Sequence, residues 1–137
     1  MSRRSGCPIS IALELLGDSW SLLIVRDLMF KGRYTFNEFL AGGEGIATNI
    51  LTDRLRRLEQ AGIVAKHPDP ADGRRSLYRL TEKGIGLAPV LLELVLWSAA
   101  HENTDAPPAV LRQMREHRRM FLADVQRQWA SAPSGEA

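Results

Sequence analysis

The sequence predicts a mainly α-helical fold with one small β-hairpin. Two patterns and the composition support this fold class. Apolar residues recur at helical spacing along most of the chain, and Gly or Pro separates the segments. Between residues 63 and 80 the pattern changes to short runs of β-forming residues around a cluster of turn residues. The 137 residues, 45% hydrophobic and 25% charged, have the size and composition of one globular domain.

Four helices are expected in the first half of the chain, at residues 8–17, 20–32, 35–41 and 47–61. The second is apolar on almost every side, so we expect it at the centre of the core. Asp18 or Ser19 can cap this helix. Thr35 and Glu38 have the spacing of a capping box at the start of the third helix. A Gly-rich run breaks the chain before the fourth helix, and Gly62 closes that helix.

The second half predicts a hairpin and two longer helices. The strands are expected at residues 63–67 and 75–80, and the helices at 82–102 and 109–130. The turn-rich stretch PDPADGR lies between the strands and predicts a long tip. Thr81 can cap the first of the two helices. The final residues, 131–137, are expected to be disordered.

Two short helices joined by a Gly-rich break, with a hairpin directly after the second, indicate a winged helix-turn-helix. We therefore expect a DNA-binding domain at residues 1–103, which includes a first dimerisation helix. Residues 104–130 would add a C-terminal helix that also serves dimerisation, before the tail.

The helix at 47–61 has one apolar face, made by Leu51, Leu55 and Leu58, and one polar face. The candidate DNA contacts are Thr48, Asn49, Thr52, Asp53, Arg54, Arg56 and Arg57. Asn and Arg are the side chains best suited to paired hydrogen bonds with adenine and guanine edges, and Thr can reach a base or a phosphate. The alternative is an ordinary solvated helix face.

The charged candidates suit different kinds of contact. Arg54 and Arg57 flank the apolar stripe and suit backbone phosphates, which set the register on DNA. Asp53 either accepts a hydrogen bond from cytosine or pairs with Arg57 one helical turn away.

Positive charge gathers in and after this helix. Residues 54–83 hold eight Lys or Arg against four acidic residues, whereas the whole chain has a net charge of only +2. Gly73 supplies a turn beside Arg74 and Arg75, which are placed to reach a minor groove or its phosphates. A solvated surface is the alternative, but this position in the chain favours DNA contact.

The helix at 82–102 carries more apolar surface than one small domain can cover. A second copy of the chain is the simplest partner, so we expect a homodimer. The alternative is that the final helix covers this surface within one chain. No uninterrupted apolar run reaches about 18 residues, so no membrane span is expected. The basic and then apolar N-terminus resembles a signal peptide only briefly because Glu14 interrupts it, and we expect a cytoplasmic protein.

Catalytic, metal and cofactor sites are not expected. The run GGEG at residues 42–45 lacks the Gly-Lys-Ser/Thr of a phosphate loop, and the three histidines are dispersed. Aromatic and Met side chains such as Trp20, Met29, Trp97 and Met120 could line a pocket for a small-molecule effector, although plain core packing is the commoner role.

The single cysteine, Cys7, excludes a disulfide within the chain. It precedes Pro8 at a helix start, where backbone N–H groups and Arg3 and Arg4 would favour the reactive thiolate. Cys7 is therefore a candidate redox sensor, and an inert thiol is the alternative.

Several motifs together resemble the HxlR-type transcriptional regulators, relatives of the MarR group. They are Cys7-Pro8, Gly17-Asp18-Ser19-Trp20, Arg26-Asp27-Leu28, Phe36-Asn37-Glu38, Leu51-Thr52-Asp53-Arg54-Leu55 and Leu80-Thr81-Glu82-Lys83-Gly84. The likeness covers residues 7–101. It implies a homodimeric winged-helix protein that binds a pseudo-palindromic operator in double-stranded DNA, often as a repressor. It also implies that residues 47–61 are the recognition helix and 68–75 the wing, and that a cysteine at the position of Cys7 can sense oxidants or electrophiles.

This sequence departs from the family pattern at Ala47, where members usually have a capping Ser. Thr48 is expected to take over the cap, which makes it a weaker candidate for DNA contact. The C-terminal helix also extends beyond the usual end of the family. A winged-helix module that binds protein partners instead of DNA is the alternative function.

Overall fold

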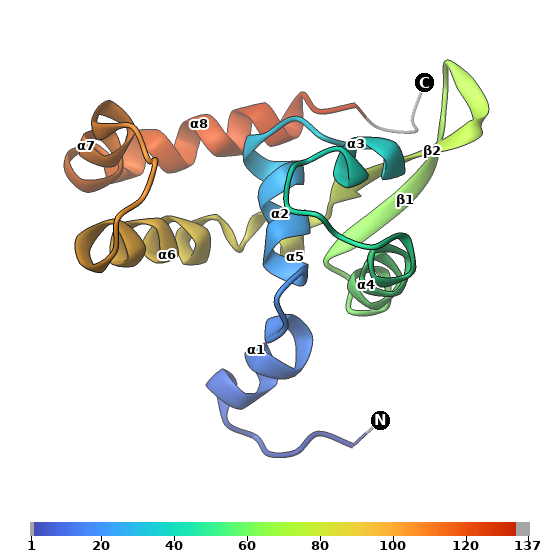
Figure 1. Ribbon diagram of the computed structural model, residues 1–137, viewed down its shortest axis with the longest axis horizontal. Helices are drawn as coiled ribbons and strands as arrows, with labels where there is room; N and C mark the ends of the chain where they lie inside the picture. The colour runs from blue at the N-terminus through green and yellow to red at the C-terminus, as the bar shows by residue number, and fades with distance from the viewer. Residues whose placement is uncertain (1, 134–137) are drawn as a thin grey trace.

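The computed structural model describes residues 2–133 and has a mainly helical fold with one hairpin (Figure 1). Its elements are α1 (Pro8–Leu16), α2 (Ser21–Phe30), α3 (Phe36–Leu40), α4 (Thr48–Gln60), β1 (Val64–Asp69), β2 (Asp72–Leu80), α5 (Glu82–Ile85), α6 (Ala88–His101), α7 (Pro108–Glu116) and α8 (Arg118–Ala130). The two strands pair antiparallel. With α3 and α4 followed directly by the hairpin, this is the predicted winged helix-turn-helix.

Helix α2 lies at the centre of the fold, as its apolar sequence predicted (Figure 1). Its residues Ile24, Val25 and Leu28 are buried. The apolar stripe of α4 packs into the same core, and Leu51 and Leu58 are almost completely inaccessible to solvent. Burial of this stripe fixes the rotation of α4 about its axis and so decides which of its residues face outward.

The segment that joins α2 to α4 is held by polar contacts. Thr35 and Glu38 form the predicted capping box at the start of α3. The buried Asp27 carboxylate pairs with Arg33 at 2.9 Å and with Arg26 at 2.8 Å. Arg26 also contacts Glu44 in the Gly-rich turn at 2.9 Å. This network fixes the path of the chain into α4.

The hairpin is longer and its tip shorter than predicted. Only Pro70 and Ala71 separate the two strands. The Asp69 carboxylate accepts a hydrogen bond from the N–H of Ala71 at 2.8 Å and pairs with Arg75 at 2.6 Å. These local bonds close a tight turn that the density of turn residues did not specify.

The apolar segment expected as one helix at 82–102 is divided in two. Thr81 caps α5 as predicted, since its hydroxyl accepts the N–H of Gly84 at 3.1 Å. Gly86 and Leu87 interrupt the helix before Pro89, which suits the first turn of α6 because it lacks an N–H. By length and composition alone, Glu82–His101 is apolar enough to cross a membrane, and so are α1 and α2 taken as one segment bent by 81°.

The final helix is also divided, at His117, into α7 and α8. The backbone of His117 has φ −129° and ψ 46°, and neither Gly nor Pro stands there. The break lets Met114 of α7 and Val125 of α8 both be buried. Residues 131–133 form no helix or strand, and the rest of the predicted tail lies outside the described residues.

Candidate nucleic-acid interface

The outward face of α4 carries the predicted base-reading side chains. Thr48, Asn49, Thr52 and Arg56 are all exposed. Thr48 does not cap the helix: Ala47 occupies the capping position and no side chain bonds there, so that expectation was wrong. Instead the Thr52 hydroxyl donates to the carbonyl of Thr48 at 2.9 Å.

Three other charged residues of α4, Asp53, Arg54 and Arg57, form ion pairs with one another or with Asp18, which precedes α2. Asp53 pairs with Arg57 at 3.0 Å, which is the turn-to-turn contact considered from the sequence. Arg54 contacts both Asp53 and, at 3.1 Å, the Asp18 carboxylate beside the start of α2. Only 18% of the Arg54 side chain is exposed. Arg54 therefore links α4 to Asp18 at the start of α2, whereas Arg57 remains mostly exposed.

Asp18 is the centre of this attachment. Its carboxylate accepts the backbone N–H groups of Trp20 and Ser21, at 2.8 and 2.9 Å, and the Ser21 hydroxyl at 2.5 Å. Burial raises the pKa of the Asp18 carboxyl, but the hydrogen bonds from Ser21, Trp20 and Arg54 outweigh it and the pKa is lowered. An ionised Asp18 thus accepts the N–H groups at the start of α2 and holds α4 beside it. Trp20 occupies the capping position and its side chain forms no capping hydrogen bond, so the cap predicted at Asp18 or Ser19 was wrong.

The two arginines of the wing have different surroundings. The Arg74 side chain is 93% exposed, and its one ion pair within residues 2–133 is with Asp72, at 3.3 Å. Arg75 is held by Asp69, whose pKa is lowered by the N–H of Ala71 and by this guanidinium. Arg74 is therefore free to meet a ligand, whereas Arg75 also stabilises the turn.

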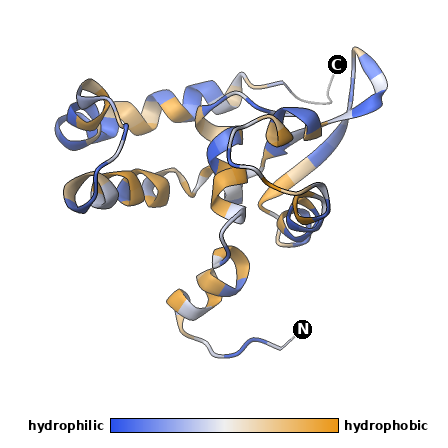
Figure 2. Ribbon diagram, viewed as in Figure 1, coloured by the Kyte–Doolittle hydropathy of each residue, from blue (hydrophilic) through white to orange (hydrophobic). Residues whose placement is uncertain are grey.

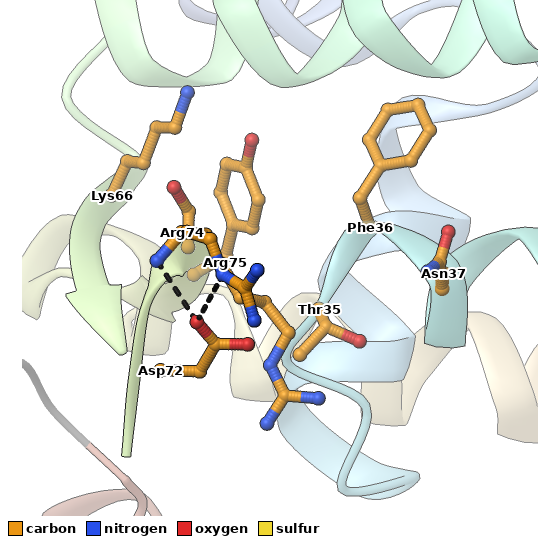
Figure 3. A pocket seen from close by; sticks show the side chains of 9 residues that line it. Thr35, Phe36, Asn37, Lys66, Asp72, Arg74 and Arg75 are labelled. Carbon is orange, nitrogen blue, oxygen red and sulfur yellow. Dashed lines mark hydrogen bonds and ion pairs between the residues drawn. The ribbon is translucent and has the colours of Figure 1, made fainter. Parts of the chain in front are cut away.

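A hollow of about 620 Å³ lies between the start of α3 and the hairpin (Figure 3). It is lined by Thr35, Phe36, Asn37, Lys66, Asp72, Arg74, Arg75, Ser76 and Tyr78. The Lys66 amine lies 5.9 Å from the centre of the Tyr78 ring. Its three cationic side chains against one carboxylate suit an anionic ligand of the size of a phosphate and its sugar.

Lys66 and Asn37 were not among the residues predicted for the site. Both are exposed. Lys66 pairs across the hairpin with Tyr78, and that register places its side chain on the face that meets α3. The alternation of side chains along the strand could have indicated this face, but only with the register known. Among the described residues, no group of His, Cys, Asp and Glu is suited to hold a metal ion.

Cys7 is exposed and stands just before α1. The Arg4 side chain turns toward Ser10 and Glu14, at 3.4 and 3.9 Å, rather than being bonded at the thiol. Ile9 and Leu13 of α1 are 72% and 57% exposed, so the cysteine adjoins an uncovered apolar helix.

The four residues considered for an effector pocket are dispersed. Met29 is buried in the core, while Trp97 and Met120 are 61% and 62% exposed. Trp20 lines a small hollow with Ile46 and Leu51. The structure therefore does not bring these side chains around one cavity.

Residues 15–106 match the family described as HxlR-like helix-turn-helix. The chain belongs to this family. It is an HTH-type transcriptional regulator rather than an enzyme, and the helix-turn-helix of such regulators binds DNA. The resemblance found in the sequence motifs is thereby confirmed.

Two relatives illustrate the likeness in sequence. The HTH-type regulator sll1512 of Synechocystis is 39% identical over 88 residues, which are 64% of this chain and 64% of that protein, somewhat under two thirds. Rv3095 of Mycobacterium tuberculosis is 37% identical over 111 residues, 80% of this chain and 69% of that protein. α8 lies beyond the matched family residues.

Solved structures share the fold. PA1607 is 37% identical with a TM-score of 0.68, covering 77% of this chain and 72% of that one. The redox regulator HypR in its oxidised form is 30% identical with a TM-score of 0.63, covering 72% and 100%. Reduced YodB of Bacillus subtilis is 34% identical with a TM-score of 0.59, covering 71% and 95%, and YodB structures also exist in diamide-treated and quinone-bound forms. A MarR-family regulator of Enterococcus faecalis, at 29% identity and TM-score 0.57, supports the MarR-like architecture.

The role of Asp18 gives a pH-dependent prediction. Asp18→Asn should lower the free energy of unfolding at pH 7 by about 1 kcal/mol, because the hydrogen bonds at the start of α2 are weakened and Arg54 loses its ionised partner. Because the folded state lowers the pKa of Asp18 below its ordinary 3.8, this stabilisation is present above that pH and is lost as the pH falls through the folded pKa. Urea denaturation of wild type and variant at several pH values between about 7 and about 3 measures the free energy of unfolding.

The matched control is Glu93→Gln, which removes a carboxylate that pairs with Arg118 on the exposed surface and should change stability little at any pH. If the free energies of unfolding of wild type and Asp18→Asn differ by the same amount at both ends of the pH range, the assigned role is wrong.

Proposed function

We propose that this protein is a homodimeric, sequence-specific DNA-binding repressor that occupies a pseudo-palindromic operator. One observation carries the proposal: the buried leucine stripe leaves Asn49, Thr52 and Arg56 exposed together on α4, beside a basic hollow at the hairpin. Figure 1 shows α4 and the hairpin on the same side of the molecule, away from α7. The proposed place of action is the cytoplasm, where the DNA is.

Base reading is assigned to three residues on the outward face of α4, Asn49, Thr52 and Arg56. Asn49 and Arg56 can form paired hydrogen bonds with adenine and guanine edges in the major groove, and Thr52 can contact a thymine methyl group or a phosphate. Asp53 faces outward less freely because it is engaged by Arg54 and Arg57. We assign it to orienting Arg57, which leaves Arg56 as the main source of base preference.

Phosphate contacts are assigned to the hollow and the wing. Lys66 and Arg74 are exposed cations on the hairpin, and Asn37 supplies a neutral donor from α3 (Figure 3). Contacts of this kind position a protein on the duplex without selecting a sequence, and they make affinity depend on salt. Arg57 extends the same basic surface along α4.

Dimer formation is supported by uncovered apolar surface on α6 and α1. Val90, Leu94 and Trp97 recur at the spacing of one helix face and are 44%, 43% and 61% exposed. Helices α2, α7 and α8 pack on α6, and Leu91 and Leu92, which lie on a different side of this helix, are buried. Figure 2 shows hydrophobic residues along both α1 and α6. A twofold pair that covers this surface would present two α4 helices to half-sites about one DNA turn apart.

Cys7 is the proposed sensor that gates this dimer. The neighbouring structures include a named redox regulator and a quinone-bound form, and Cys7 is accessible to similar reagents. A quinone would add to the Cys7 sulfur, and the thiol proton would pass to a quinone oxygen. A two-electron oxidant would instead join Cys7 to the partner subunit's Cys7, or to a small-molecule thiol, and take up the electrons and protons of both thiols. A noncovalent small-molecule effector is the alternative signal.

Base reading and phosphate contact predict different responses to mutation. Arg56→Ala should weaken binding to the selected operator by about 1–3 kcal/mol and relax preference at the contacted base. Lys66→Ala should weaken binding to all duplexes alike and reduce the slope of log affinity against log salt by about 0.9. Operator selection from random duplexes, followed by titration at several salt concentrations, measures both.

The control for these two variants is Arg115→Ala, which removes an exposed cation from α7, on the far side of the molecule (Figure 1). It should leave affinity and slope unchanged. A wild-type protein that binds no duplex at low salt, or an Arg56→Ala variant with unchanged operator preference, would favour the alternative of a protein-binding module.

The dimer surface predicts that a charge on α6 produces monomers. Leu94→Glu should shift the protein to the monomer mass in sedimentation analysis and abolish binding to the two-half-site operator, because a buried unpaired carboxylate opposes association. Gln126→Glu adds a charge at an exposed site of α8 and should leave the mass unchanged. A Leu94→Glu protein that sediments as the wild type does would exclude this surface as the dimer interface.

The sensor assignment predicts that Cys7→Ser binds the operator normally but no longer responds to diamide or benzoquinone. Mass spectrometry of the treated wild-type protein should find the adduct or the intersubunit disulfide at Cys7. If treatment releases wild type and Cys7→Ser from DNA equally, the response does not pass through this thiol.

A further inference from the structure

The last turn of α8 is bonded to the second strand of the wing. The Trp129 indole N–H donates to the carbonyl oxygen of Leu80 at 2.7 Å. In return the Arg79 guanidinium donates to the carbonyl oxygen of Trp129 at 2.8 Å, and its central carbon lies 4.9 Å from the centre of the indole ring. Two hydrogen bonds and one cation–π contact thus join Trp129 to the adjacent residues Arg79 and Leu80 of β2.

The position of Trp129 is fixed by the earlier turns of α8. Val125 is buried, and Phe121 packs against Phe30 of α2 with ring centres 6.2 Å apart. These contacts anchor α8 to the central helix, and the hydrogen bond from Trp129 to Leu80 joins its end to β2. Because α8 lies outside residues 15–106, the link is additional to the part of the chain that the family shares.

The hairpin needs support because a two-stranded sheet is only marginally stable alone. Tyr78 and Leu80 are buried in the core on one face of β2. Side chains alternate along a strand, so Arg79 projects from the opposite face, which Trp129 covers. Arg74 lies five residues nearer the tip, at most about 17 Å along the strand. Restraint at the base of the strand therefore limits where Arg74 can go.

We propose that Trp129 is a positioning residue for the wing: α8 holds β2 at Arg79 and Leu80, and this aims Arg74 at the DNA backbone. The inference rests on the proposed DNA-binding function. It assigns to the C-terminal helix a role in DNA binding in addition to any part in the dimer, although Trp129 itself touches no DNA.

The test compares operator binding by Trp129→Ala, Trp129→Phe and Gln128→Ala at several salt concentrations. Trp129→Ala should bind about three- to tenfold more weakly and lose about one phosphate contact from the salt slope. Trp129→Phe keeps a ring for Arg79 but lacks the N–H donor, so its loss should be smaller. Gln128→Ala changes the neighbouring exposed residue and should bind as the wild type does.

Combination with two other variants separates positioning from general stability. In an Arg74→Ala background, Trp129→Ala should cause little further loss, because the side chain that it positions is already absent. In an Arg56→Ala background the two losses should multiply. Losses that multiply in both backgrounds, or a Trp129→Ala protein that binds as the wild type does, overturn the proposal.

Thermal unfolding followed by circular dichroism confirms that each variant is folded at the assay temperature. If Trp129→Ala is not, the same comparisons with Trp129→Phe decide, and unchanged binding and slope by that folded variant overturn the proposal. Failure of the proposed function is distinguishable, since Arg56→Ala and Arg74→Ala would then also have no effect. If both of them weaken binding and the Trp129 variants do not, only this inference fails.

Discussion

Burial of three leucines on α4 is the constraint on which the proposed DNA-binding surface depends. Leu51, Leu55 and Leu58 are 0%, 2% and 1% exposed. Each successive residue of a helix is rotated by about 100°, so fixing this stripe against α2 also fixes the direction of every other side chain of α4. Asn49 and Arg56 face outward as a consequence of what the leucines bury. The ion pair between Arg54 and Asp18 adds a polar restraint at the edge of the stripe.

Pairing within the protein divides the arginines near the interface into two groups. Arg54 and Arg75 are held by the carboxylates of Asp18 and Asp69, and each of these carboxylates also accepts a backbone N–H. Ligand binding by such a guanidinium would have to compete with bonds already formed. Arg56 and Arg74 have no comparable restraint among the described contacts, apart from the partly exposed Asp72 beside Arg74. The local excess of positive charge is therefore larger than the charge that is available to DNA.

The sequence was sufficient to predict the elements whose signals are local. The leucine spacing predicted the two faces of α4, and the Thr35–Glu38 spacing predicted a capping box that the structure contains. The pairing of Arg54 could not be predicted in the same way, because its partner lies 36 residues earlier in the chain. The face of the hairpin on which Lys66 lies depends on the strand register, and the tip is shorter than the sequence predicted. The break at His117 carries no Gly or Pro, so no local signal in the sequence marks it.

The proposed sensor and the proposed DNA surface are separated in the fold, and this separation limits how one can act on the other. Cys7 stands just before α1, near the exposed Ile9 and Leu13, whereas the proposed DNA contacts lie on α4 and the wing (Figure 1). A modified thiol there need not touch the duplex. Under the proposed function, α1 and α6 contribute to the surface between subunits, so a bulky adduct or a crosslink at Cys7 changes how two rigid protomers meet. Affinity for an operator with fixed half-site spacing depends on the distance between the two α4 helices of the proposed dimer. A change in the contact between subunits alters that distance without unfolding either winged-helix domain.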